Sequence, residues 1–188
     1  MPTILSHPAV PLALGAGLGA RAIPPRLLAA GVVACVLPDA DVIGHALGVP
    51  WGSDFAHRGF THSLPFALGL ALLGAAAWRR LGAPPLTVLS FLFAAGASHG
   101  LLDACTNGGS GIALLWPLSS ERYFAPFRVI EVSPIGVVRF LSARGLDVLA
   151  SELVWVWLPA ALLAALLAAA RRLRANRREP LDPRAGGV

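Results

Sequence analysis

The sequence predicts an all-α protein of the membrane, a polytopic bundle of about five helices with a cluster of polar residues at one end. Two measures of composition lead to this fold class. Hydrophobic residues make up 56% of the chain and charged residues only 13%, and the mean hydropathy is +0.69. Because water-soluble domains carry about 25% charged residues, most of the surface is expected to face lipid.

Five apolar segments account for the predicted helices. They cover residues 8–20, 27–37, 64–78, 86–102 and 153–170. The last two approach the roughly 20 residues that a helix needs to cross a bilayer core, the third is slightly short, and the first two are shorter still. Backbone N–H and C=O groups inside lipid must bond to one another, so all five segments are expected to be helical. We expect the first two to extend through their flanks or to sit partly inside the bundle.

The basic C-terminal run sets the domain boundary. Residues 1–170 are expected to form one membrane-embedded domain, and residues 171–188 a basic cytoplasmic tail that is disordered. Arginines beside an apolar helix are typical of a cytoplasmic membrane anchor. Nucleic acid is therefore not expected as a partner.

The arginines also predict how the helices are oriented. If the tail lies in the cytoplasm, five alternating spans place the N-terminus outside. The arginines then expected inside are Arg21, Arg26, Arg79, Arg80 and the run that begins at Arg171, and those expected outside are Arg58, Arg122, Arg128, Arg139 and Arg144. This excess on one side satisfies the positive-inside rule.

The histidines all fall on the predicted outer side or at the outer ends of helices. They are His7, His45, His57, His62 and His99, and the acids at the same level are Asp39, Asp41, Asp103 and Glu152. Ionisable groups at membrane depth are costly and mark functional sites. We therefore expect a site that faces the non-cytoplasmic side.

The sharpest local signal is the pair His99 and Asp103. At positions i and i+4 of a helix, two side chains are about 40° apart and point the same way. An imidazole and a carboxylate at this spacing share one metal ion or bind adjacent ions. The alternative is a histidine at a helix end with the aspartate as a simple partner.

A second signal is the segment HRGFTHS at residues 57–63. Positions i and i+5 are about 140° apart on a helix, so His57 and His62 converge only if Gly59 makes a turn. Arg58 is expected either to pair with a nearby carboxylate or to meet the negative charge of a substrate such as a phosphodiester.

A third signal is the pair of acids Asp39 and Asp41, which follow Pro38 at the outer end of the second segment. Alone it is weak, since Pro-Asp is common in loops. His45 follows one turn later and is expected at the periphery. His7 lies just before the first segment, where the alternative to a role in a site is that it caps the helix.

Together these motifs predict a polar metal site at the outer end of the bundle. The predicted ligands are His7, Asp39, Asp41, His57, His62, His99 and Asp103. Nitrogen and oxygen ligands without sufficient thiolates suit zinc, with manganese or iron as alternatives. So many ligands indicate one to three divalent ions.

At these residues the chain resembles the YdjM-like family of membrane-bound, metal-dependent hydrolases. The matching features are His7, LPDAD at 37–41, HRGFTHS at 57–63, SHGLLD at 98–103 and LLWP at 114–117. They cover most of the chain apart from the tail, and HRGFTHS is fairly specific. The resemblance implies a multi-pass protein of the cell inner (plasma) membrane.

A more distant similarity is to the helical zinc-dependent phospholipases C and nucleases. His99 and Asp103 match the H-x-x-x-D pair of that group. His7, the acids at 39 or 41 and the histidines at 57 or 62 occur in a similar order, and Glu152 is a candidate to complete the set. Because no histidine follows Asp103, the similarity implies a dinuclear site rather than a full trinuclear one.

The leading hypothesis for function is a hydrolase that uses metal-activated water on a phosphoric ester, such as a lipid headgroup at the outer leaflet. The predicted catalytic residues are Asp103 and His62, which would manage protons, and Arg58, which would hold the anion. Membrane lipid is the expected partner. The alternatives are a non-catalytic protein with a structural metal and a transporter of metal or solute.

Overall fold

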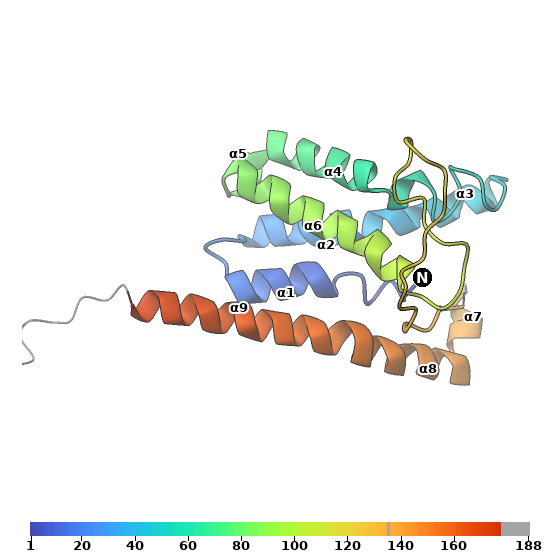
Figure 1. Ribbon diagram of the computed structural model, residues 1–188. Helices are drawn as coiled ribbons and strands as arrows, with labels where there is room; N and C mark the ends of the chain where they lie inside the picture. The colour runs from blue at the N-terminus through green and yellow to red at the C-terminus, as the bar shows by residue number, and fades with distance from the viewer. Residues whose placement is uncertain (135, 178–188) are drawn as a thin grey trace, which may run out of the picture.

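The computed structural model describes residues 1–134 and 136–177, and Figure 1 shows a bundle of helices that lie side by side. The five main apolar helices are α1 (Ala9–Leu18), α2 (Pro25–Val36), α4 (Leu64–Ala76), α6 (Pro85–Ala104) and α9 (Leu158–Asn176). Within the described ranges no residue belongs to a β-strand, and pairing is limited to isolated bridges. The predicted all-α bundle of about five apolar helices is confirmed.

Three helical stretches are long and apolar enough to cross a membrane: Pro25–Ala46, Pro85–Ala104 and Ala143–Asn176. The first is longer than the predicted segment 27–37 because α2 continues through the 3-10 turn η1 (Leu37–Asp41) into α3 (Val42–Ala46). The expected extension of this segment through its flank is therefore confirmed. Helices α1 and α4 remain shorter, and α4 is followed by the single turn α5 (Trp78–Leu81).

The last helical stretch is longer than predicted at both ends. After the short α7 (Val137–Phe140), α8 (Ala143–Glu152), the π-helical turn η3 (Leu153–Trp157) and α9 form one stretch of 34 residues. At about 1.5 Å per residue it measures about 50 Å, against about 30 Å for a hydrocarbon core. Residues 171–176 are thus helical, which corrects the prediction of a tail that is disordered from residue 171. The rest of that tail, from residue 178, lies outside the described residues.

Small residues let α6 pack closely on its neighbours. A Cβ added to Gly96 of α6 would lie 3.1 Å from the Cβ of Ala67 on α4. Phe91 and Leu92 of α6 fill the core together with Leu27 of α2. Close backbone approach through small residues is how helices gain van der Waals contact in a membrane. Helices α4 and α6 are therefore closely packed against each other.

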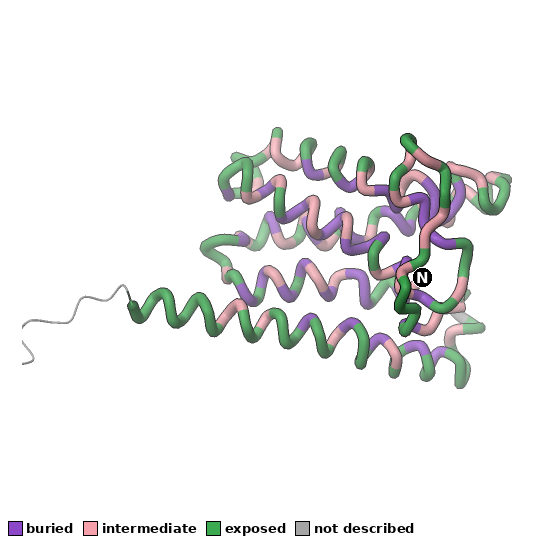
Figure 2. The backbone as a smooth tube through the Cα atoms, viewed as in Figure 1, coloured by how far each residue is buried: buried purple, intermediate pink, exposed green. Residues whose placement is uncertain are grey.

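Helix α9 lies at the edge of the bundle against α1. Ala9 and Ala13 of α1 are buried against Ala160, and a Cβ added to Gly17 would lie 2.6 Å from the Cβ of Leu167. Elsewhere this last stretch is open: 6% of its apolar window is buried, and Figure 2 shows it exposed over most of its length. In a membrane this apolar surface faces lipid.

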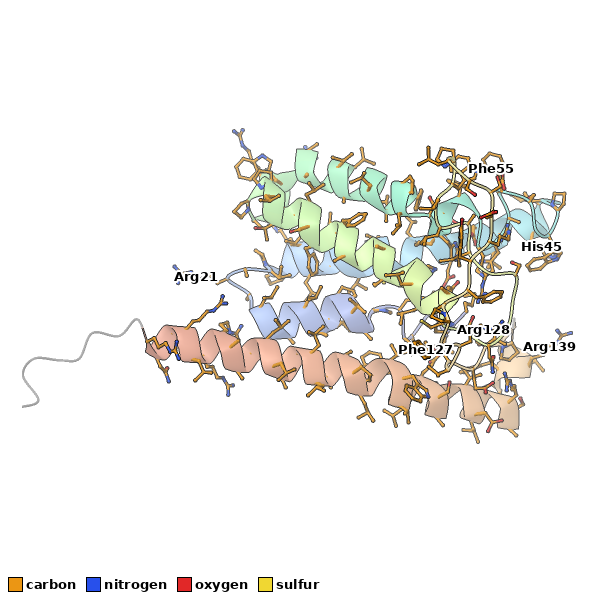
Figure 3. All side chains as sticks on the ribbon, in the orientation of Figure 1. Arg21, His45, Phe55, Phe127, Arg128 and Arg139 are labelled. Carbon is orange, nitrogen blue, oxygen red and sulfur yellow. The ribbon has the colours of Figure 1, made fainter. Side chains whose placement is uncertain are left out.

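The two ends of the bundle differ in chemistry. At the loop end, α2 and α6 finish, α4 begins, and the connecting segments 47–59 and 105–134 gather (Figure 1). The opposite end, where α9 finishes, is called the tail end. Figure 3 places Arg21 at the tail end and His45, Arg128 and Arg139 at the loop end.

Arg122 fastens the two connecting segments to each other. Its guanidinium donates to the carbonyl oxygens of Ser53 (2.9 Å), Gly52 (3.2 Å) and Arg58 (3.2 Å). One residue of the second segment thus satisfies three backbone acceptors of the first. The loop end is consequently an ordered cover over the polar residues beneath it.

Candidate metal centre

Five side chains converge beneath this cover, and we call them the five-residue cluster: His7, Asp39, His62, His99 and Asp103. His7 precedes α1, Asp39 lies in η1, and His62 ends the 3-10 turn η2 (Phe60–His62). His99 and Asp103 lie one turn apart in α6 and point the same way, as their spacing predicts. All five are buried, and all five are among the predicted ligands.

The Nε2 atoms of the three histidines face the carboxylate oxygens. His62 Nε2 lies 3.4 Å from Asp103 Oδ2 and 3.8 Å from Asp39 Oδ1. His99 Nε2 lies 3.5 Å from Asp39 Oδ1. His7 Nε2 lies 3.6 Å from Asp39 Oδ2 and 3.8 Å from Asp103 Oδ1. Each carboxylate thus contacts at least two of the three imidazoles.

These facing atoms have no hydrogen-bond partner among the described residues. Buried polar groups without partners cost free energy, so such an arrangement calls for another group between them. Four atoms that hold one zinc ion at about 2.1 Å lie about 3.4 Å from one another. The observed separations of 3.4–3.8 Å are close to this value, so the cluster fits a divalent ion.

The orientation of His99 is fixed by its other ring nitrogen. Nδ1 donates to the carbonyl oxygen of Cys35 at 2.7 Å. Because a carbonyl only accepts, the proton must sit on Nδ1, which leaves the lone pair of Nε2 directed at the cluster. Cys35 also donates its thiol to the carbonyl oxygen of His7 at 3.0 Å. Cys35 therefore supports two cluster residues, which its position in an apolar run did not indicate.

Asp41 lies behind the cluster rather than in it. Its Oδ1 accepts from His57 Nδ1 at 2.7 Å, and its Oδ2 accepts from Thr61 Oγ1 at 2.6 Å and lies 3.3 Å from His62 Nδ1. A carboxylate behind a metal-ligating histidine orients the ring and raises its basicity. The geometry thus gives Asp41 a supporting position instead of the ligand position that the sequence suggested. Thr61 was missed, although it lies inside the HRGFTHS motif.

The turn expected at Gly59 brings His57 and His62 together. A Cβ at Gly59 would lie 2.6 Å from the carbonyl oxygen of Ala56, so only glycine fits this turn. The rings of His57 and His62 lie 5.1 Å apart. Ligand atoms of Asp39, His57 and His62 lie within 4.8 Å of one another, which gives a second set of possible metal ligands beside the cluster.

Arg58 pairs with a carboxylate, which is the first of the two roles considered for it. Its Nε lies 3.4 Å from Asp103 Oδ2, and its other nitrogens donate to Gly108 O and Thr106 Oγ1, both at 2.9 Å. Arg58 is 2% exposed and adopts φ +67°, a strained value for a residue other than glycine. The structure therefore holds this guanidinium against a cluster carboxylate. Thr106 carries no sequence signal that could have identified it.

Glu152 does not join the cluster, in contrast to its expected place in the ligand set. Its carboxylate accepts from the backbone N–H and hydroxyl of Thr3 and from Ser6 Oγ at 2.6 Å. Trp157 also donates to Ser6 Oγ, at 3.0 Å. These contacts fasten the segment that carries His7 to the last helical stretch. His45, expected at the periphery, lies exposed with its ring 4.0 Å from that of Trp51.

The carboxylates control the protonation of His62. Burial alone lowers the pKa of this imidazole, but the carboxylates of Asp103 and Asp41 outweigh burial and raise the pKa to about 9. In contrast, burial and the neighbouring His99 lower the pKa of His7 to about 3. A divalent ion must therefore displace a proton from His62 but not from His7.

A small cavity of about 170 Å³ opens next to Arg58, whose guanidinium contacts Asp103 of the cluster. It is lined by His57, Arg58, Gly109 and Ser110, together with Met1, Trp51, Val132 and Ser133. A volume of this size holds a few water molecules or one small anionic group, since water occupies about 30 Å³ in the liquid. The cavity thus adjoins the cluster through Arg58.

Comparison with known proteins places the chain in a family. The YdjM inner membrane protein family matches residues 1–176. The chain belongs to this family. Together with the apolar helices, membership of the YdjM family makes it an inner membrane protein.

A curated relative agrees with this assignment. The inner membrane protein YbcI of Escherichia coli (strain K12) is 49% identical over 168 residues, which cover 89% of this chain and 97% of that protein. No solved structure matches. The likeness to zinc-dependent phospholipases C and nucleases therefore rests on the quoted motifs alone, whereas the YdjM family is shown by the whole chain.

Proposed function

We propose that this protein is a membrane-bound, metal-dependent hydrolase that acts on a phosphoric ester, such as a lipid headgroup, at the non-cytoplasmic face. The five-residue cluster carries the proposal, because its buried Nε2 and carboxylate atoms face one another without hydrogen-bond partners among the described residues, next to a small cavity lined by His57 and Arg58. Three imidazoles and two carboxylates suit zinc, with manganese or iron as alternatives. The second set of ligand atoms, at Asp39, His57 and His62, leaves room for another ion.

The supporting residues suit this chemistry. A bound divalent ion would supply Lewis acidity and a water of lowered pKa. Asp41 holds His62 from behind, and Arg58 places positive charge beside Asp103 and along the cavity wall. This charge favours an anionic substrate in the cavity.

His57 is the residue best placed to exchange a proton with such a substrate. Its Nδ1 is held by Asp41, so Nε2 is the nitrogen that remains for proton transfer or for a second ion. His57 also lines the cavity. An aspartate-oriented histidine is a common general acid or base.

A structural metal is the second candidate, and the complete burial of the cluster favours it. His7, His99 and Asp103 are 0% exposed, and the five residues come from separate parts of the chain. A closed ligand set of this kind stabilises a fold without catalysis. Transport receives less support, because the buried polar residues in the described part of the chain gather at the loop end rather than through the bundle.

One experiment separates the two candidates. Detergent-purified protein is loaded with zinc or manganese and screened against phospholipids, polyprenyl phosphates and simple phosphodiesters, with a chelator as control. If the site is catalytic, the protein should turn over a substrate, and a chelator should abolish this turnover while the helices stay folded. His57→Gln should then lower kcat by at least about 100-fold. His45→Gln, a change at an exposed histidine, is the matched control and should keep full activity.

The opposite result is equally clear. If metal-loaded protein cleaves none of these substrates, and removal of the metal unfolds the helices, the metal is structural. Asp103→Asn then lowers thermal stability, with no activity to lose.

A further inference from the structure

Helix α4 carries an apolar groove on its outer side. A cavity of about 610 Å³ follows the helix from Pro65 and Trp116 to Leu73 and Ala76. A second cavity, of about 440 Å³, is lined by Leu73, Ala76 and Ala77 together with Arg79 and Arg80. Leu73 and Ala76 line both cavities. The two cavities are therefore neighbours along the helix surface, and we call them together the α4 groove. It runs from the loop end to an arginine pair at the tail end.

Gly69 in the middle of this groove has no role in helix packing. An added Cβ would meet a neighbouring side chain at Gly15, Gly17, Gly31, Gly74 and Gly96 and the backbone oxygen of His62 at Gly100, whereas at Gly69 no atom lies within 4 Å of it. Glycine destabilises a helix interior relative to alanine. Glycine at position 69 therefore improves no packing inside the bundle. Its missing side chain instead leaves the groove wider at this point.

The dimensions of the groove match one hydrocarbon chain of one leaflet. Gly69 lies about 10 Å along α4 from the end of that helix at Ala76, and Arg79 follows in the next helical turn, α5. One leaflet contributes half of a hydrocarbon core of about 30 Å. A chain whose headgroup lies at Arg79 therefore ends close to Gly69.

The arginine pair is available for an anion. Among the described residues, the arginine–carboxylate ion pairs are those of Arg58 with Asp103 and of Arg144 with Glu131. Arg79 and Arg80 are exposed, and the guanidinium of Arg79 lies 5.4 Å from the ring centre of Trp78. Arginine binds phosphate through parallel N–H donors, and tryptophan is enriched at the membrane interface.

We propose that the α4 groove binds one anionic phospholipid, with an acyl chain over Gly69 and the phosphate at Arg79 and Arg80. This site lies at the end of the bundle opposite the five-residue cluster and is independent of the proposed hydrolysis. A second copy of the chain fits the groove less well, because it offers no identified anionic group that would face the two guanidinium groups.

Native mass spectrometry of the detergent-purified chain tests the site. Phosphatidylglycerol is titrated against phosphatidylcholine of the same chain length, and we expect tighter retention of the anionic lipid. Arg79→Gln with Arg80→Gln should weaken that retention about 25-fold, since each arginine near an anionic membrane surface contributes about fivefold. Gly69→Leu should weaken binding of both lipids, because the leucine fills the groove.

Matched controls keep the test decisive. Arg21→Gln with Arg26→Gln removes the same charge at the same end, and Ala161→Leu adds the same bulk to an exposed position of α9; both should bind lipid normally. The proposal is overturned if either control loses as much binding as its groove counterpart. It is also overturned if the chain is a dimer that Gly69→Leu dissociates, since a second copy then occupies the groove. Thermal unfolding of each variant shows that the bundle is intact.

Discussion

The imidazole rings of His7 and His99 lie stacked, with 3.8 Å between their centres and 20° between their planes. The contact joins the segment before α1 to the last turns of α6, and neither ring is exposed. Two positive charges this close would repel strongly in a buried site. The two rings are therefore not expected to be charged together. The pKa of His7, which burial and the neighbouring His99 lower to about 3, makes its ring neutral, the form in which histidine binds a metal.

The first prediction concerns metal content. His99→Ala removes the imidazole that Cys35 holds toward the cluster, so zinc or a similar ion in detergent-purified protein should fall well below stoichiometry. Elemental analysis measures this, with His45→Ala as the control because His45 is exposed and outside the cluster. Unchanged metal in the His99, His62 and Asp103 variants would refute the site.

Asp41 should behave differently from the cluster acids. Asp41→Asn leaves both histidines in place but weakens the contacts that orient them, so metal affinity should fall by about 10–100-fold while binding remains stoichiometric at high metal. Competition with a chromophoric chelator measures the affinity. Asp54→Asn is the control, since among the described residues the carboxylate of Asp54 accepts a hydrogen bond only from the exposed hydroxyl of Ser120. If Asp41→Asn abolishes binding as completely as Asp103→Asn, Asp41 is a direct ligand.

Gly100 should prove essential for the geometry of the cluster. An added Cβ would lie 2.5 Å from the backbone oxygen of His62, so Gly100→Ala must push η2 away from α6. We expect a loss of about 1–3 kcal/mol in stability together with weaker metal binding. Thermal unfolding and elemental analysis measure the two effects. Gly69→Ala, with open space around its Cβ, should leave metal binding unchanged and should raise stability by up to about 1 kcal/mol, because alanine is the better helix former.

The orientation in the membrane is testable with reporter fusions. Because the arginines at the tail end exceed those at the loop end, fusions after Arg80 and after Arg177 should both report the cytoplasm. A fusion within the loop end, after Ser120, should report the opposite side. A periplasmic signal from either of the first two fusions would overturn the topology and with it the predicted sidedness of the candidate metal centre.

The sequence predicted those features that depend on local periodicity. The apolar segments became the main helices because backbone groups in lipid have no other partners. His99 and Asp103 converge because their spacing is a property of the α-helix. The turn at Gly59 was also predictable, since histidines five residues apart meet only if the helix is interrupted.

Features that depend on contacts between distant segments could not be predicted. Asp41 and Asp39 look alike in the sequence, yet η1 turns one carboxylate into the cluster and the other toward His57 and Thr61. Arg58 was assigned two possible partners, and the fold brings Asp103 to it. Glu152 was a candidate to complete the ligand set, because the sequence did not show that Thr3 and Ser6 would contact its carboxylate.

The contact of Glu152 with Thr3 and Ser6 bears on how the protein is made. His7 is the first cluster residue to leave the ribosome, but the carboxylate that fastens its segment is synthesised near the end of the chain. A nascent chain that stops before Glu152 therefore contains all five cluster residues, but the segment that carries His7 has no fixed position. Completion of the candidate metal centre would thus wait for insertion of the final helix. If the cluster binds an ion, prematurely terminated chains should be unable to retain it.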